Sequence, residues 1–378
     1  MKQRFSLILL FSLFYLCAVY AGSSDHGLSL LSEQTISGSS RYVGMGGAMG
    51  AVGGDVSAAV DNPAGIGLFR RSELSVSMDI SGQRCSSEEE MRSILVSAPS
   101  VSWLFHFGSY GRVRGVLGQS LAFSYGRRCG IDERWLGRVQ PDYARQWLYW
   151  RGTAEVRQDD YNLDYGINID NQLYFGVGMS LRTYRMVILA DYSGDEATIA
   201  KSSNDVPSDQ LVSYDDERLS TLGFGLRAGV LYRPTNWLRL GGAIHTPTWV
   251  SKMQRMSMRT VAALAFQLQN IAIISAEYDF NHDGTGNLKD EHLLKSGVEY
   301  VFLKNGFLNA GYAYSFYTSR HIATVGLSWR SKHFVAGMAY MFGRTGMPQV
   351  RSSFNIVDTP LLKYSHNFVF TLAFRYGG

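Results

Sequence analysis

The dominant pattern along this chain is the alternation of apolar residues with small or polar ones. After Ala21 no stretch reaches the roughly 18–20 consecutive apolar residues that a membrane-spanning helix needs. Instead, segments of about ten residues repeat with a period of two, the spacing at which strand side chains point to opposite faces. The pattern predicts an all-β protein made of many strands.

The segment that begins at Leu173 shows the two faces clearly. One face carries Leu173, Phe175, Val177, Met179 and Leu181, and the other carries Tyr174, Gly176, Gly178, Ser180 and Arg182. The same alternation predicts about fourteen strands, at approximately 72–81, 99–109, 115–126, 153–169, 173–193, 219–233, 237–252, 257–268, 271–280, 292–303, 307–318, 321–331, 334–343 and 364–376.

The period alone does not separate a soluble sandwich, which buries its apolar faces, from a membrane barrel, which turns them to lipid. The connections discriminate better. Tight turns such as Asp170-Asn171 and Asn305-Gly306 alternate with long connections at 82–98, 127–152, 194–218, 281–291 and 344–363. Tight turns at one end and long loops at the other are typical of outer-membrane barrels. The fold class that we expect is a transmembrane antiparallel β-barrel.

Residues 1–21 read as a secretory signal peptide, with basic Lys2 and Arg4, an apolar run and small residues before a cut ahead of Gly22. Cleavage would remove those two residues from the 36 basic ones and leave 34 against 32 acidic residues. This near balance argues against a nucleic-acid partner. Forty Gly, 22 Tyr and 20 Phe suit a curved, closed sheet.

The mature chain keeps two cysteines, Cys85 and Cys129, in connections expected on the outer side. They are a candidate disulfide, but spacing does not set the Cα separation that a bridge requires. Metal sites usually show clustered Cys or His, whereas these two cysteines are isolated. The sequence also lacks a Gly-x-Ser-x-Gly hydrolase motif, and we do not expect an enzyme.

One connection has the spacing of a calcium loop. Asp279, Asn281 and Asp283 supply oxygen ligands at positions one, three and five, Gly284 follows at six, and Asp290 stands at twelve. A solvated hairpin loop is the alternative interpretation of the same residues.

Several charges fall on the faces expected to line the lumen: Arg182, Arg227, Arg239, Glu277, Lys295 and Glu299. Such charges either pair with one another or bind a ligand. Arg182 and Arg239 are candidates to meet a carboxylate. Trp147 and Trp150, in an aromatic cluster near the outer loops, are candidates for an apolar pocket.

The segment from Gly22 to Arg71 differs from the rest because it is rich in Gly, Ala and Ser. Its glycines at 44 and 46 do not form a dinucleotide loop, because Met49 holds the third glycine position. The runs 41–48, 53–55 and 62–67 instead resemble the N-terminal hatch of the FadL/TodX family, in its Bacteroidetes-type form. The run 238–249 also resembles a family strand.

The resemblance implies a fourteen-stranded barrel (72–378) plugged by the hatch (22–71), with gating residues Gly44, Gly46, Gly47, Asn62, Pro63, Ala64 and Gly65. It implies passive, hatch-gated transport of fatty-acid-like or aromatic molecules across the bacterial outer membrane by a monomer. We expect no cofactor, because diffusion down a gradient needs none. The expected partners are the lipid bilayer, a hydrophobic ligand, and the insertion machinery that reads the aromatic last strand. A PorV-like barrel that serves protein secretion is the alternative, and a non-specific pore is disfavoured by the plug.

Overall fold

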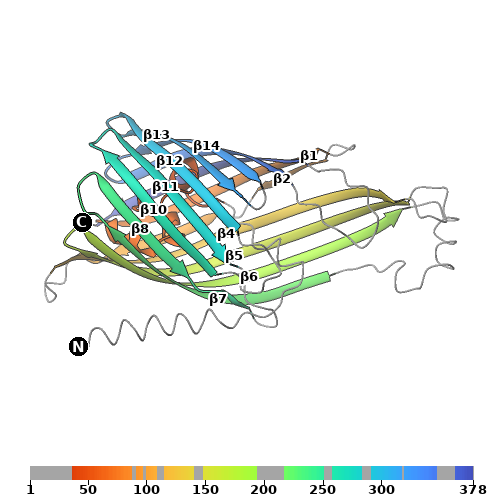
Figure 1. The fold of residues 1–378 in the computed structure, drawn as a ribbon, viewed down its shortest axis with the longest axis horizontal. Helices are drawn as coiled ribbons and strands as arrows, with labels where there is room; N and C mark the ends of the chain where they lie inside the picture. Colours follow the sequence, from red (N-terminus) through yellow and green to blue (C-terminus); the bar gives the residue numbers. More distant parts are fainter. Residues whose placement is uncertain are drawn as a thin grey trace.

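The computed structural model describes the backbone of residues 36–86, 91–96, 99–108, 115–139, 148–193, 217–250, 258–282, 291–316, 319–346 and 362–377. All strands among these residues belong to one antiparallel sheet. Its first strand, β1 (Ser72–Ser86), pairs with its last, β16 (Leu362–Tyr376), from Ser72↔Tyr376 to Ser86↔Leu362. The sheet therefore closes into a barrel (Figure 1).

The remaining strands follow one another around the barrel in chain order. They are β2 (Met91–Val96), β3 (Ser100–His106), β4 (Val116–Val139), β5 (Leu148–Ile169), β6 (Leu173–Ser193), β7 (Glu217–Tyr232), β8 (Leu238–His245), β9 (Trp249–Val250), β10 (Met258–Leu268), β11 (Ala272–His282), β12 (Glu291–Leu303), β13 (Gly306–Ser315), β14 (Arg320–Arg330) and β15 (Phe334–Gly346). The short strand β2 pairs with β1 and continues the line of β3. In the same way, β9 pairs with β7 and continues the line of β8. The wall is thus fourteen strands around, as the sequence predicts.

The apolar rows face outward. On β16, Phe370 and Leu372 are 45% and 68% exposed, whereas the intervening Thr371 and Ala373 are 5% and 6% exposed. The other strands repeat the pattern, with large apolar side chains on the outer surface and small or polar ones inside. A soluble sandwich would bury such rows, because large exposed apolar areas are unfavourable in water. The barrel interpretation of the alternation is confirmed.

Aromatic pairs lie on the outer surface at both ends of the barrel. Toward the long connections, Tyr–His pairs bridge neighbouring strands at Tyr278–His292, Tyr312–His321 and Tyr340–His366. Toward the tight turns, aromatic pairs form at Trp103–Tyr376, Trp237–Phe266 and Phe334–Phe374. Amphipathic rings at two levels are typical of the two membrane–water interfaces.

Strands β4 and β5 are longer than predicted. Together with β6, which spans 173–193 as predicted, they project beyond the rest of the wall (Figure 1). β4 and β5 pair along their whole described length, from Val116↔Ile169 to Val139↔Leu148, with no loop between these pairs. The expected loop at 127–152 was therefore wrong over most of its length. A sheet in water on both faces needs no apolar row, so alternation cannot reveal it. Cys85 and Cys129 likewise lie in strands β1 and β4 rather than in loops.

The strand predicted at 237–252 is interrupted at Thr246-Pro247-Thr248. Proline has no N–H to donate to a neighbouring strand. At this point the register with β7 shifts by one residue, between Arg227↔His245 and Phe224↔Trp249. Thr246 keeps the edge paired: its N–H donates to Leu226 O (2.8 Å) and its Oγ1 accepts from Leu226 N (2.9 Å). The predicted turn Asp170-Asn171 is confirmed, with φ of 52° and 56°, typical of a type I′ hairpin.

Residues 36–71, the described part of the chain before β1, lie inside the barrel, where Figure 1 shows them in orange. We call residues 36–71 the hatch. It contains α2 (Ser40–Gly44), η2 (Ser57–Val60) and η3 (Pro63–Leu68), and most of its residues are buried. Ser39 caps α2 by accepting a hydrogen bond from Tyr42 N. None of the helices in the described part of the chain has the length and apolar character of a membrane span.

Candidate functional site at the hatch

The hatch rests on an apolar patch of the wall. Val43, Met45 and Met49 are fully buried and belong to one cluster with wall residues that include Met341 and Val369. Glycines allow the tight turns of the hatch itself. At Gly46 and Gly47 its backbone turns with φ of 63° and 74°, which only glycine adopts without strain. The hatch is therefore compact and packs closely against an apolar part of the wall.

A belt of wall glycines lets the hatch backbone approach closely. A Cβ on Gly311 would lie 2.2 Å from Gly46 N, and one on Gly176 would lie 2.2 Å from the Pro63 carbonyl carbon. Similar approaches, all under 3.0 Å, occur at Gly166, Gly229, Gly241, Gly297 and Gly337. These contacts come from seven different strands, so the fit between hatch and wall is tight around much of the circumference.

The Asn62-Pro63-Ala64 motif starts η3 and also fastens it to the wall. Asn62 is extended (φ −140°), its Oδ1 accepts from Ala64 N (3.1 Å), and Pro63 occupies the first turn. The Asn62 amide then donates to Gly50 O (2.8 Å) in the hatch and to Val230 O (3.1 Å) in β7. Gly65 packs against Gly53, another turn of the hatch.

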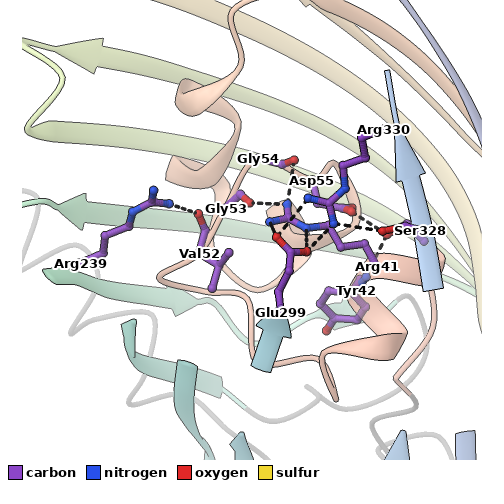
Figure 2. A network of polar contacts seen from close by, with 11 residues as sticks. Arg41, Tyr42, Val52, Gly53, Gly54, Asp55, Arg239, Glu299, Ser328 and Arg330 are labelled. Carbon is purple, nitrogen blue, oxygen red and sulfur yellow. Dashed lines mark hydrogen bonds and ion pairs between the residues drawn. The ribbon is translucent and has the colours of Figure 1, made fainter. Parts of the chain in front are cut away.

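The first of two ion-pair networks joins α2 to the wall (Figure 2). The Arg41 guanidinium donates to both carboxylate oxygens of Glu299 on β12, at 2.8 and 3.0 Å. Its Nη1 also donates to Gly53 O (3.1 Å) and Gly54 O (3.2 Å). Arg330 on β14 contacts the same carboxylate. Bidentate guanidinium–carboxylate pairs are the strongest and most directional of such bonds, so Glu299 fixes the position of α2.

The second network surrounds Asp61, beside the Asn62 motif. Asp61 accepts from Arg259 Nη2 (2.6 Å) and from the Tyr42 hydroxyl (2.5 Å), and its carbonyl meets His245 Nε2 at 2.9 Å. The Lys295 amine lies 3.8 Å from Asp61. Burial and the nearby Asp61 carboxylate raise the pKa of Tyr42, so its phenol keeps the proton that it donates.

Lys295 extends this network to β11. Its amine contacts Glu277 at 2.8 Å and Asp279 at 2.7 Å, and Arg259 also contacts Asp279 at 2.6 Å. Glu277 in turn accepts from Gly50 N in the hatch (2.6 Å). The carboxylates of Asp61, Glu277 and Asp279 are close enough to hold a metal ion, but the Lys295 amine already supplies a cation among them. The cluster therefore fastens the hatch.

Predicted lumen charges pair mainly with protein groups. Arg227 makes two bonds of 2.8 Å to Asp164. Arg239 donates to Val52 O in the hatch (2.9 Å; Figure 2) and to Gln267. Arg182 donates to Thr248 Oγ1 (2.7 Å) and lies 3.6 Å from Asp160. Arg182 and Arg227, like Lys295, Glu277 and Glu299, thus contact opposite charges, whereas Arg239 bonds to neutral groups and serves the hatch. A ligand-binding role for Arg182 and Arg239 stays a prediction.

The remaining residues proposed from the sequence lie elsewhere in the structure or outside its described part. Gly44 packs against Gly326 and Asn309. Asp279 and Asn281 lie in strand β11, where Asp279 contacts Arg259 and Lys295, and the calcium loop stays a prediction. Asp283 and Asp290 lie outside the described residues. So do Trp147 and the side chains of Trp150, Cys85 and Cys129, and the disulfide stays a prediction.

Sequence reasoning missed Asp61, Arg259 and Tyr42, which hold the second network. Arg259 was within reach, because it stands at an inward position of the strand predicted at 257–268. Asp61 and Tyr42 carry no periodic signal, since the hatch is neither a strand nor a long helix. Only its placement in the lumen shows that Asp61 is buried beside cations.

The sequence matches no known family model and no curated protein. Solved structures do share its fold. The toluene transporter TodX of Pseudomonas putida is similar with a TM-score of 0.66 at 13% identity, over 91% of this chain and 99% of that one. The toluene transporter TbuX of Ralstonia pickettii gives 0.64 at 14% identity, over 90% and 99%.

A FadL homologue of Pseudomonas aeruginosa is similar with a TM-score of 0.60 at 12% identity, over 91% of this chain and 99% of that one. At such identities the likeness shows the fold alone. That fold is the closed, fourteen-stranded antiparallel barrel of the FadL and TodX structures. The Bacteroidetes-type resemblance stays a prediction.

Proposed function

We propose that this chain lets small hydrophobic molecules cross the bacterial outer membrane through a barrel that its N-terminal hatch gates. The observation that carries the proposal is the seat of the hatch, which closes against seven strands at wall glycines and is held by two ion-pair networks. A firmly bound plug of this kind is not expected in a pore that stays open. The shared fold of the toluene transporters supports the same class of substrate, aromatic or fatty-acid-like.

The mechanism follows from the strength of the seat. Removing one partner of a buried ion pair costs about 3–5 kcal/mol, and withdrawal of the whole hatch would break both the Arg41–Glu299 and the Asp61–Arg259 pairs. Passage therefore requires a local shift at an edge of the hatch, and the ligand moves down its own gradient. No cofactor or energy source is needed.

The remaining expectations belong to the same proposal. The signal peptide (1–21) directs the chain out of the cytoplasm, and the insertion machinery reads β16. The outward apolar rows then contact the lipid bilayer directly, and a single closed barrel works as a monomer.

A second candidate is a binding or shuttle barrel that serves protein secretion. The observation that favours it is the projection of β4, β5 and β6, whose paired backbones extend beyond the other strands and offer a surface to a partner protein (Figure 1). In that case the hatch would stay closed, and no small molecule would pass.

Uptake separates the two candidates. Cells that lack their own hydrophobic channels would express the full chain, and the entry of radiolabelled toluene and oleate would be timed. We expect faster entry than in vector controls, and faster still when residues 22–71 are deleted. A chain that co-purifies in equal amounts with a secretion component, and speeds the entry of neither tracer, would establish the shuttle function.

A further inference from the structure

A polar recess separates the hatch from one side of the wall. It has a volume of about 50 Å³ and lies between the hatch and strands β1, β3, β4 and β5, near Ser100, where β3 begins. The hatch contributes Ser37 and Ser57 to its lining, and the wall contributes Ser75, Ser102 and Ser124. At this recess the hatch stands off from the wall, in contrast to the close contacts at the wall glycines.

The wall serines form a continuous row. Ser75 is opposite Ser102, Ser102 is opposite Ser124, and Ser124 is opposite Asn162 in the pairing of four successive strands. A second row lies two residues farther along β1, toward the long connections, and begins with Ser77 opposite Ser100. Because paired residues on one face point in the same direction, the two rows line one side of the lumen with hydroxyl groups.

The charges beside the recess are already paired. Of the two charged residues on its lining, Asp160 lies 3.6 Å from Arg182 and Arg127 lies 2.9 Å from Asp159. Arg227 binds Asp164 and also donates to Asn162 Oδ1 (2.9 Å), the amide at the end of the serine row. The groups that the row presents are therefore neutral donors and acceptors, which suit a neutral polar group better than an ion.

Hydrocarbon is a poor occupant of such a surface. A buried hydroxyl that loses water without gaining a partner costs about 1–3 kcal/mol. A site built to bond a hydroxyl consequently rejects the analogue without one far more strongly than an apolar pocket distinguishes two hydrocarbons. A recess of this size holds a few water molecules, or the polar end of a molecule that displaces them.

We propose that the serine row is a selectivity site of the passage, and that it favours neutral amphiphiles with a hydroxyl or similar hydrogen-bonding group over bare hydrocarbons. The inference rests on the proposed transport function and refines its substrate class. The polar end of the ligand replaces water along Ser75, Ser102 and Ser124, while its apolar part follows as the hatch edge shifts.

The test compares two probes of equal chain length, radiolabelled dodecanol and dodecane, in cells that express the full chain. The first quantity is the ratio of their entry rates, each corrected for vector controls. The variant carries Ser75→Ala, Ser102→Ala and Ser124→Ala together. The matched control is Ser275→Ala, a buried inward serine on β11 that donates to Gly297 O, away from the recess. Heat-modifiable migration of each barrel on gels checks that it has folded.

We expect dodecanol to enter faster than dodecane, and the triple variant to lower their ratio about tenfold, the effect of one or two lost hydrogen bonds. The control should leave the ratio unchanged. An equal rate for both probes, or a folded triple variant with an unchanged ratio, would overturn the selectivity proposal while the transport function stands. Entry of neither probe above the vector level would instead overturn transport itself.

Discussion

The strongest single test of the hatch seat is the replacement of Lys295 by methionine. The Lys295 amine is 2% exposed and lies 2.7–3.8 Å from three carboxylates, those of Asp279, Glu277 and Asp61. Methionine fills similar space but removes the charge, and Arg259 alone then faces all three anions. Breaking a buried pair in this way costs about 3–5 kcal/mol. The hatch relieves the repulsion by withdrawing Asp61 from the strand residues.

This free energy corresponds to an increase of about 10² to 4 × 10³ in the fraction of molecules with a displaced hatch. Amide hydrogen exchange in lipid nanodiscs measures that fraction directly. We expect hatch peptides that span 50–62 to exchange faster in Lys295→Met by that factor, while peptides from β16 keep their protection. The matched control is Lys304→Met, in the exposed turn between β12 and β13.

Adding Glu277→Gln to Lys295→Met removes one of the crowded anions and should restore part of the protection. Unchanged hatch exchange in a folded Lys295→Met barrel would refute the reasoning, because the hatch would then not depend on the charges that surround Asp61.

Three further predictions address other parts of the structure. Gly311→Val should unseat α2, because a Cβ there would lie 2.2 Å from Gly46 N; limited proteolysis should cut the hatch, whereas Gly242→Val, whose Cβ would meet nothing nearer than 3.9 Å, should leave it protected. Asn62→Ala removes the cap of η3 and the bonds to Gly50 O and Val230 O, and should destabilise the hatch by about 1–3 kcal/mol in exchange measurements. Nitroxide labels along 368–374 should alternate in their collisions with oxygen dissolved in the lipid, high at the even positions and low at the odd ones; uniform values would show that the apolar row does not face lipid.

The barrel was predictable because lipid imposes a periodic rule on its strands. Phe370 and Leu372 alternate with Thr371 and Ala373, and the structure turns the first pair outward as expected. The rule fails where its cause is missing. Residues 127–139 of β4 belong to the projecting part of the wall and carry no apolar row, and Pro247 separates β8 from β9 although the surrounding alternation continues.

The hatch contacts were not predictable from spacing. Arg41 reaches Glu299 across 258 residues, and Asp61 reaches Arg259 across 198. Alternation placed Glu299 and Lys295 on the lumen face, but it says nothing about which hatch residue meets them. The Asn62-Pro63-Ala64 motif indicated where the chain bends. Its bond to the β7 carbonyl depends on the tertiary fit, which the glycine belt permits.

The most direct test of the account is the ion conductance of the purified chain in a planar lipid bilayer, with and without residues 22–71. We predict that the complete mature chain inserts but conducts little, since the seated hatch fills the lumen. The deletion variant should show a large, steady conductance that befits an empty fourteen-stranded barrel. A freely conducting complete chain, or a deletion variant that inserts without conducting, would contradict the claim that the hatch is what closes this barrel.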